Sequence, residues 1–152
     1  MTEVSSPEVH AAIACLQRLS DLFQERRQQL ASSVGLSEQQ WAVLEEVSTE
    51  HFMPSLFARQ RSSSAAAVSK ILRQLLDKRV VAVHVNKEDG RQRQYALTSA
   101  GKKKLEQLRA ERARAMADVW QGFSQKDLEA FTRFGDQLTE RLERYAQSVT
   151  ER

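Results

Sequence analysis

The fold of this chain is decided by the stretch Asp89-Gly90-Arg91-Gln92-Arg93-Gln94-Tyr95-Ala96-Leu97-Thr98-Ser99-Ala100-Gly101. It joins a glycine-containing turn to a short strand and then to the start of a helix. Just before it, residues 80–85 are rich in valine, and residues 94–97 can form a partner strand across a loop at 86–90. We therefore predict a two-stranded antiparallel hairpin.

A hairpin of this size is only marginally stable alone in water, so one of its faces must pack against helices. The rest of the hairpin carries Lys87, Arg91 and Arg93, whose positive charges would be offered to a partner. The exposed tip is therefore the predicted functional end of the hairpin.

Two short helices are predicted before the hairpin. Residues 55–61 form the first helix, Ser62 and Ser63 the turn, and residues 64–78 the second helix. The apolar face of the second helix consists of Val68, Ile71, Leu72 and Leu75. Its opposite face consists of Ala65, Ala66, Ser69, Lys70 and Arg73. Such small or hydrogen-bonding side chains let a helix approach base edges and phosphates, as a DNA recognition helix must.

The distribution of charge supports a DNA-binding surface in this part of the chain. Residues 55–104 contain twelve Lys or Arg against three Asp or Glu, a local charge of +9. The whole chain carries only +3, so the remaining residues sum to −6. Positive charge concentrated on one motif is what phosphate neutralisation and counterion release require.

These residues resemble the MarR family of bacterial and archaeal transcriptional regulators. In that family the pattern D-x-R, then five residues, then L-T-x-x-G ends the wing and opens the next helix. Here the pattern is matched by Asp89, Arg91, Leu97, Thr98 and Gly101. The wider resemblance runs through Leu36-Ser37, Phe57-Ala58-Arg59, Val68-Ser69-Lys70 and Val80-Val81 to a paired helical tail. It implies a winged helix-turn-helix fold of the α+β class, mainly α-helical with a small antiparallel hairpin as its wing.

The chain departs from the family pattern at Arg79, where many members have a glycine between the recognition helix and the wing. We therefore expect the recognition helix to end without a glycine in the left-handed conformation, which is the easiest way to cap a helix.

The proposed DNA contacts fall into two groups. Base edges would be contacted by Ser63, Ser64, Ala65, Ala66 and Ser69, with the alanines meeting thymine methyl groups. Phosphates would be bound by Lys70 and Arg73. The alternative for the alanines is that they simply favour the helix.

The resemblance also assigns roles in the wing. It implies that Arg91 enters the minor groove while Asp89 holds it in place. The alternative is a surface Asp and Arg that merely shape a turn around Gly90.

The terminal segments are predicted to be long helices. The first begins near Ser6-Pro7, and a capping box of Ser37 with Gln40 starts the next, with Leu36 and Trp41 placed for a hydrophobic staple. After the wing, one helix runs from Ser99 to about Phe123, and Ser124 with Asp127 starts the last. Apolar side chains recur along these helices at Val9, Ile13, Leu16, Phe23, Leu30, Leu105, Leu108, Met116 and Trp120, and at Leu128, Phe131, Phe134, Leu138, Leu142, Tyr145 and Val149.

This apolar surface exceeds what a small winged-helix core can cover, so we expect it to pack against a second copy of the chain. The alternative is an intramolecular helical bundle. A symmetric dimer would present two recognition helices roughly 34 Å apart, and its operator would be an inverted repeat.

Length and composition fit one domain, residues 1–152. Within it we expect a DNA-binding lobe at 36–98 and a helical dimerisation region formed by 5–34 and 99–150. No apolar run or leader pattern indicates a membrane or secreted protein, so we expect a cytoplasmic location. A single cysteine excludes an intrachain disulfide.

Members of the family commonly respond to small, often aromatic molecules. A pocket for a small aromatic or phenolic ligand could be lined by Phe23, Trp41, Phe52, Met53, Met116 and Trp120. The alternative is that most of these side chains belong to the core.

Other chemistry has little support in the sequence. His10, His51 and His84 are scattered, so we expect no metal, and no cofactor or catalytic motif is recognisable. Some members of the family sense peroxides through a cysteine near the start of the first helix, where Cys15 lies. Because its neighbours Ala14 and Leu16 are apolar, we expect Cys15 to be a small buried residue.

The sequence therefore predicts a homodimeric transcriptional regulator that binds double-stranded DNA, acts as a repressor and is released by a ligand. The alternatives are a redox-sensing repressor that uses Cys15 and a winged helix that serves as a protein-interaction module. An enzyme is not expected.

Overall fold

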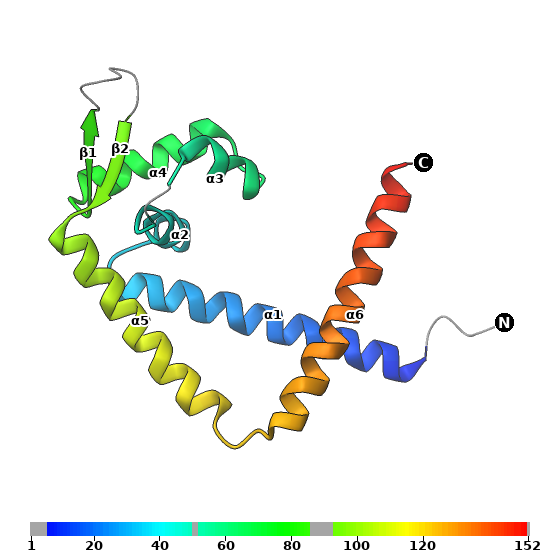
Figure 1. The fold of residues 1–152 in the computed structure, drawn as a ribbon. Helices are drawn as coiled ribbons and strands as arrows, with labels where there is room; N and C mark the ends of the chain where they lie inside the picture. Colours follow the sequence, from blue (N-terminus) through cyan, green and yellow to red (C-terminus); the bar gives the residue numbers. More distant parts are fainter. Residues whose placement is uncertain (1–5, 50–51, 86–92, 152) are drawn as a thin grey trace. The chain divides into compact units, whose positions relative to one another are not determined.

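The computed structural model describes residues 6–49, 52–85 and 93–151. Within them the chain forms six helices and one antiparallel pair of strands (Figure 1). The predicted mainly α-helical fold with a small hairpin is confirmed. The chain divides into two compact units, Met1–Arg112 and Ala113–Arg152, which are described separately below.

Helix α1 (Pro7–Ser33) begins where the sequence predicts. The Ser6 side chain accepts a hydrogen bond from the backbone N–H of Val9, and proline occupies the first turn, where its missing N–H costs nothing. The backbone N–H of Glu8 and the Ser6 hydroxyl lower the pKa of the Glu8 carboxyl. The helix ends at Ser33, and Gly35 follows the cap with a φ of 73° that allows Leu36 N–H to reach back to the carbonyl of Ala31.

Helix α2 (Glu38–Val47) starts with the predicted capping box. The Ser37 hydroxyl accepts from the N–H of Gln40 at 3.0 Å, and Gln40 Oε1 accepts from the N–H of Ser37 at 3.0 Å. Leu36 and Trp41, the two residues of the predicted staple, are both buried.

Helices α3 (Pro54–Gln60) and α4 (Ala65–Asp77) form the predicted helix-turn-helix. The turn contains Ser62 with φ of 51°, and the N–H of Ser63 donates to the carbonyl of Ala58 at 2.8 Å. Ser64 then caps α4 by accepting from the N–H of Ala67 at 3.0 Å.

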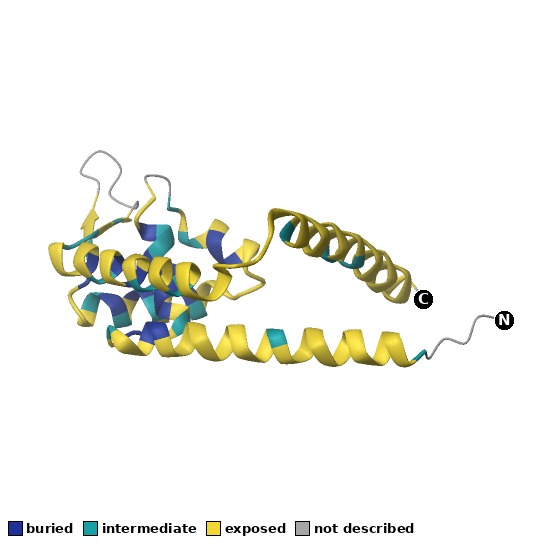
Figure 2. Ribbon diagram, turned by 90° about the horizontal axis from the view of Figure 1, so that it is seen from below, coloured by how far each residue is buried: buried dark blue, intermediate teal, exposed yellow. Residues whose placement is uncertain are grey.

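The core of the first unit is built from one face of each of these helices. Figure 2 shows the buried residues gathered in this unit, whereas most of α1 is exposed. Among the fully buried side chains are Val43, Leu44, Val68, Leu75, Val80, Leu105 and Leu108. The predicted buried face of α4 is confirmed, although Ile71 is only half-buried.

Strands β1 (Val81–Val85) and β2 (Arg93–Leu97) pair antiparallel, with Val81 opposite Leu97 and Val85 opposite Arg93. One face of the hairpin packs on the helical layer, because Tyr95 meets the ring of Phe52 edge-on at 6.2 Å. Phe52 in turn contacts Phe57 of α3 at 6.0 Å. The expectation that the hairpin needs helical support is therefore confirmed.

The C-terminal end of α4 refines one expectation from the sequence. Arg79 itself adopts the left-handed conformation, with φ of 57°. The N–H of Arg79 donates to Leu76 at 3.0 Å and the N–H of Val80 donates to Leu75 at 3.2 Å, as in a glycine-capped helix. Helix α4 therefore has no glycine at its end, as expected, but it keeps the left-handed conformation at Arg79. Burial of Val80 and the two hydrogen bonds offset the backbone strain of a non-glycine residue.

The described part of the second unit contains the end of α5 (Ser99–Trp120) and helix α6 (Gln125–Thr150). The turn between them uses Gly122 with φ of 94°. Ser124 caps α6 as predicted, accepting from the N–H of Asp127 at 3.1 Å. No described residue of α6 is buried within the single chain. Among the helices that the structure describes, none combines the length and apolar character that a membrane crossing demands.

Arg79→Gly should raise the free energy of unfolding by about 0.5–1 kcal/mol, because glycine adopts the left-handed conformation without a Cβ penalty. Urea denaturation would measure the change. The matched control is Arg79→Ala, which removes the guanidinium but keeps a Cβ in the strained conformation. Equal stability of the glycine and alanine variants would contradict the assignment of strain to this position.

Candidate DNA-binding surface

The two faces of α4 differ sharply in burial. Val68, Leu72 and Leu75 are buried, whereas the residues predicted to face DNA are all exposed, namely Ala65, Ala66, Ser69, Lys70 and Arg73. This division follows from the helical repeat of 3.6 residues, because the buried residues recur at spacings of three and four. The small side chains therefore lie where another backbone could approach the helix.

Ser63 and Ser64 lie at the start of this surface, and both are exposed. The Ser64 oxygen accepts the capping hydrogen bond from Ala67, and its hydroxyl hydrogen can still donate to a base or phosphate. The first turn of α4 contains no acidic residue that would repel a phosphate.

Two further arginines lie at the end of the first helix of the helix-turn-helix, and the charge of segment 55–104 includes them without assigning them a contact. Arg59 and Arg61 are exposed at the end of α3. The Arg61 guanidinium lies 5.4 Å from the centre of the Phe57 ring, a cation–π contact that limits its freedom. The signal that could have identified them is their position beside the turn that leads to α4.

The wing is described only at its base. Arg93 is exposed and lies opposite Val85 in the register of the hairpin. Lys87, Asp89 and Arg91 lie outside the described residues, so their predicted roles stay predictions.

The motif Leu97-Thr98-x-x-Gly101 joins the wing to α5. The Thr98 hydroxyl donates to the carbonyl of Arg79 at 2.7 Å and accepts from the N–H of Gly101 at 3.1 Å, while Thr98 N–H donates to the carbonyl of Val80 at 3.1 Å. A Cβ on Gly101 would lie 2.1 Å from the carbonyl oxygen of Val80. Thr98 therefore starts the helix, and only glycine lets the helix approach this closely.

Among the described basic residues of segment 55–104, Lys78 and Lys104 donate hydrogen bonds to backbone carbonyls of the protein. Lys78 Nζ donates to the carbonyl of Gly35 at 2.6 Å, and Lys104 Nζ donates to the carbonyl of Val34 at 2.5 Å. Both lysines thus donate hydrogen bonds to carbonyls at the C-terminal end of α1, where their positive charge offsets the negative end of the helix dipole. The local positive charge available for DNA is smaller than the sequence count suggests.

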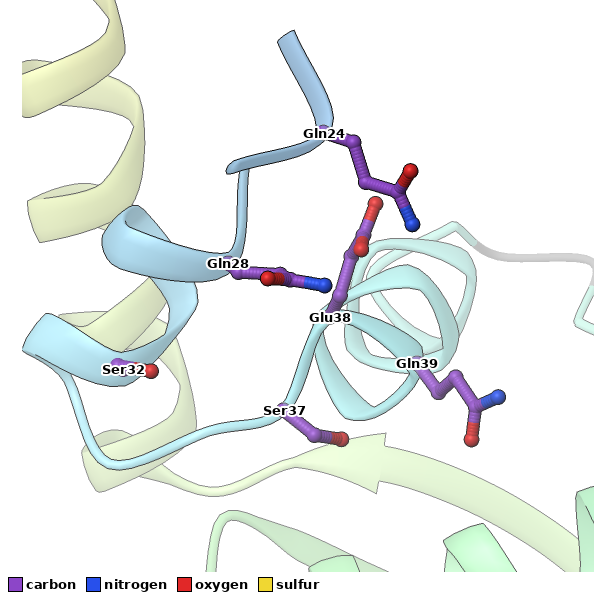
Figure 3. Close-up of a pocket in the computed structure, with 6 residues that line it drawn as sticks. All are labelled: Gln24, Gln28, Ser32, Ser37, Glu38 and Gln39. Atoms are coloured by element: carbon purple, nitrogen blue, oxygen red, sulfur yellow. The ribbon is translucent and has the colours of Figure 1, made fainter. Parts of the chain in front are cut away.

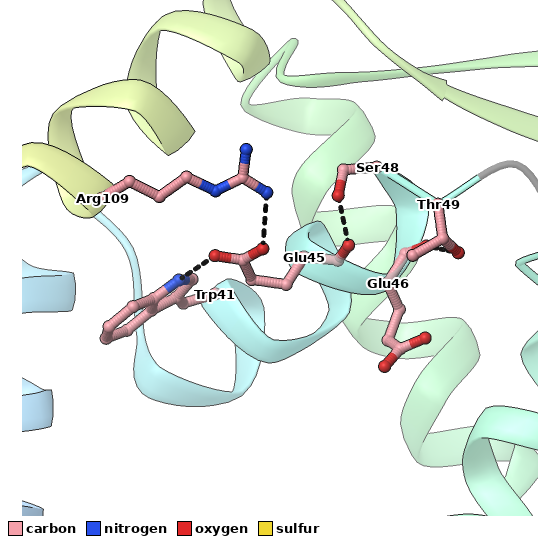
Figure 4. Close-up of polar contacts among 6 residues, drawn as sticks. All are labelled: Trp41, Glu45, Glu46, Ser48, Thr49 and Arg109. Atoms are coloured by element: carbon pink, nitrogen blue, oxygen red, sulfur yellow. Dashed lines mark hydrogen bonds and ion pairs between the residues drawn. The ribbon is translucent and has the colours of Figure 1, made fainter.

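Trp41, one of the predicted ligand-pocket residues, belongs to the core. Its indole N–H donates to Glu45 at 3.3 Å, and Glu45 also accepts from Arg109 of α5 at 2.9 Å (Figure 4). On the other side, the Arg27 guanidinium lies 5.1 Å from the centre of the Trp41 ring. These contacts tie α2 to both α1 and α5.

The other predicted pocket residues are divided between the two units. Phe52 is half-buried against the hairpin, and Phe23 and Met53 are exposed in the first unit. Met116 and Trp120 are exposed in the second unit. A pocket formed by these six side chains stays a prediction.

The structure does describe a cavity of about 510 Å³, but none of the six predicted residues lines it. It is lined by Gln24, Gln28, Ser32, Ser37, Glu38 and Gln39, which come from the second half of α1 and the start of α2 (Figure 3). These side chains are polar rather than aromatic, so this cavity differs in chemistry from the predicted one.

Cys15 lies on α1 and is exposed in the single chain. The expectation that it is a buried residue is therefore wrong within one chain, because the apolar face of α1 around it has no intramolecular cover. Of the three histidines, His10 and His84 are exposed and His51 lies outside the described residues. Among the described residues, no three His, Cys, Asp or Glu side chains group closely enough to hold a metal ion.

Solved structures of other proteins share this architecture. One MarR family transcription regulator superposes with a TM-score of 0.80 at 21% identity, covering 92% of this chain and 93% of the other. The chain has the fold of the MarR family. Staphylococcus aureus MepR in complex with DNA matches with a TM-score of 0.66 at 16% identity, covering 84% of this chain and 94% of MepR.

Staphylococcus aureus MarR in complex with salicylate and kanamycin matches with a TM-score of 0.69 at 15% identity, covering 90% of this chain and 93% of that protein. No protein-family model and no curated protein sequence matches the chain. The MarR fold that the wing motif implied is thus confirmed by structural similarity.

Gly101→Ala should lower the free energy of unfolding by about 2–3 kcal/mol, because the new methyl group must displace the backbone at Val80. Urea denaturation would measure the loss. Ser99→Ala, an exposed residue in the same turn, should stay within about 0.5 kcal/mol of wild type. A Gly101→Ala variant as stable as the control would show that α5 does not need this close approach.

Proposed function

We propose that this protein is a sequence-specific double-stranded DNA-binding regulator of transcription rather than an enzyme. The observation that carries the proposal is the exposed face of α4, where small side chains stand beside Lys70 and Arg73. The exposed Arg59, Arg61 and Arg93 add positive charge around it. The MepR complex with DNA, which shares the fold, supports a DNA-binding role.

A homodimer is the second part of the proposal. Apolar side chains stay exposed along α1 and α6, including Ile13, Leu16, Phe134, Leu142 and Tyr145. Within α6 they recur every three or four residues over 26 residues, yet the single chain buries none of them. An apolar stripe of this length is typical of a helix that packs against a second copy. The matching operator is an inverted repeat.

The third part concerns regulation. We infer a repressor in the cytoplasm that a small aromatic or phenolic ligand releases from DNA, and the MarR complex with salicylate supports this ligand class. The two recognition helices of a dimer can lie at a spacing that fits DNA or at one that does not. Such a ligand releases DNA only if it binds more tightly to the second arrangement than to the first.

Lys70→Ala and Arg73→Ala should each weaken binding to random duplex DNA and reduce the slope of log affinity against log salt by about 0.9 per protomer. The reason is that each variant removes one phosphate contact and its counterion release. Fluorescence anisotropy over a series of salt concentrations measures both quantities.

The control for this experiment is Gln147→Ala on α6, an exposed polar and uncharged residue of the second unit, which should leave the slope unchanged. A wild-type protein that binds neither random nor selected duplexes at low salt would overturn the proposed function. It would favour the winged helix as a protein-interaction module.

Phe134→Glu should convert the dimer into a monomer at micromolar concentration, because it places a charge in the apolar stripe of α6. Phe134 has 60% of its surface exposed in the single chain, so the substitution disrupts no intramolecular core. Sedimentation equilibrium measures the mass, and Gln147→Glu on the opposite face of α6 serves as the charge-matched control. Dimers of equal stability in both variants would contradict the role of this stripe.

A further inference from the structure

We propose that Lys78 is a positioning residue that, together with Gln40, fixes the recognition helix α4 against the corner between α1 and α2. In this role it sets sequence specificity and does not bind phosphate. The inference rests on the proposed function and assigns different roles to lysines that the sequence cannot distinguish.

The first step is the geometry of the Lys78 ammonium. Its Nζ donates to the carbonyl of Gly35 at 2.6 Å and to Gln40 Oε1 at 2.9 Å. Gly35 lies at the C-terminal end of α1, where the helix dipole favours a cation. Two of the three ammonium hydrogens are therefore committed within the protein.

The second step is the position of Gln40, the one polar residue among the buried residues of the described chain, with 7% exposure. Its Oε1 accepts from the N–H of Ser37 and from Lys78, and its Nε2 donates to Gln74 Oε1 at 3.0 Å. Gln74 and Lys78 belong to the last turn and the cap of α4. One buried side chain thus links the start of α2 to the end of the recognition helix.

The third step is that this network permits only one arrangement. If the Gln40 amide were flipped, its NH₂ group would face two other donors, the Ser37 N–H and the Lys78 ammonium. Rotation of α4 about its axis would likewise break the hydrogen bonds to Gln74 and Lys78. A buried amide left without partners costs about 1–3 kcal/mol, so the network holds α4 in one orientation.

The fourth step is the contrast with Lys70 and Arg73. These residues lie on the exposed face with Ala66 and Ser69. Lys78 is also exposed, but its ammonium is directed to Gln40 of α2 by a hydrogen bond. Phosphate contacts tolerate small rotations of a helix, but hydrogen bonds to base edges do not. Loss of the Lys78 network should therefore affect binding to the correct sequence far more than binding to DNA in general.

The experiment compares Lys78→Met with Lys70→Met, two substitutions of the same chemistry on one helix. The probes are a random duplex and the tightest duplex recovered from a randomised pool by the wild-type protein. Affinity is measured over a salt series at a temperature where circular dichroism shows all variants folded. A loss of stability alone changes neither the ratio of the two affinities nor the salt slope under these conditions.

Lys78→Met should lower affinity for the selected duplex by about tenfold, leave affinity for random duplex within about twofold, and keep the salt slope. Lys70→Met should weaken both affinities and reduce the slope by about 0.9 per protomer. Gln74→Met, which removes one hydrogen bond and no charge, should reduce the affinity ratio in the same direction as Lys78→Met. This variant keeps the test decisive if Lys78→Met fails to fold.

A salt slope that falls in Lys78→Met as it does in Lys70→Met would overturn the inference and leave the proposed function intact. An unchanged affinity ratio in both Lys78→Met and Gln74→Met would also overturn it. Failure of the wild-type protein to bind any duplex is a different outcome, because it removes the proposed function itself.

Discussion

The backbone of Val80 is the constraint on which the helix-turn-helix and the hairpin of this protein depend. Its N–H closes the end of α4, its carbonyl accepts the N–H of Thr98, and its side chain is fully buried. Gly101 then brings α5 against the same carbonyl at a distance that no Cβ allows. The recognition helix, the wing and the long helix α5 are therefore fixed to one another by a few backbone groups.

The basic residues of segment 55–104 carry out two different physical tasks. Lys78 and Lys104 donate hydrogen bonds to backbone carbonyls just after the end of α1, which have no partner within the helix. Lys70, Arg73 and Arg93 remain exposed. In the proposed function only these exposed residues would release counterions on binding DNA, and a charge count alone does not separate the two groups.

Burial is distributed very unevenly along the chain. The helix-turn-helix and the base of the wing enclose a core, with Trp41 tied by its indole N–H to Glu45 and through it to Arg109. By contrast, α6 leaves side chains such as Phe131 and Val149 exposed. The single chain thus stabilises the helix-turn-helix and the base of the hairpin, whereas the apolar stripe of α6 stays uncovered.

The sequence by itself determined the elements whose signals are local. Helix starts at Ser6, Ser37 and Ser124 follow from a hydroxyl that caps its own turn, and the buried face of α4 follows from apolar spacing. The tertiary structure alone decided the left-handed Arg79, the partners of Lys78 and the exposure of Cys15. These features depend on residues distant in sequence. Packing of other elements offsets the backbone strain at Arg79, supplies the hydrogen-bond partners of Lys78 and leaves Cys15 uncovered.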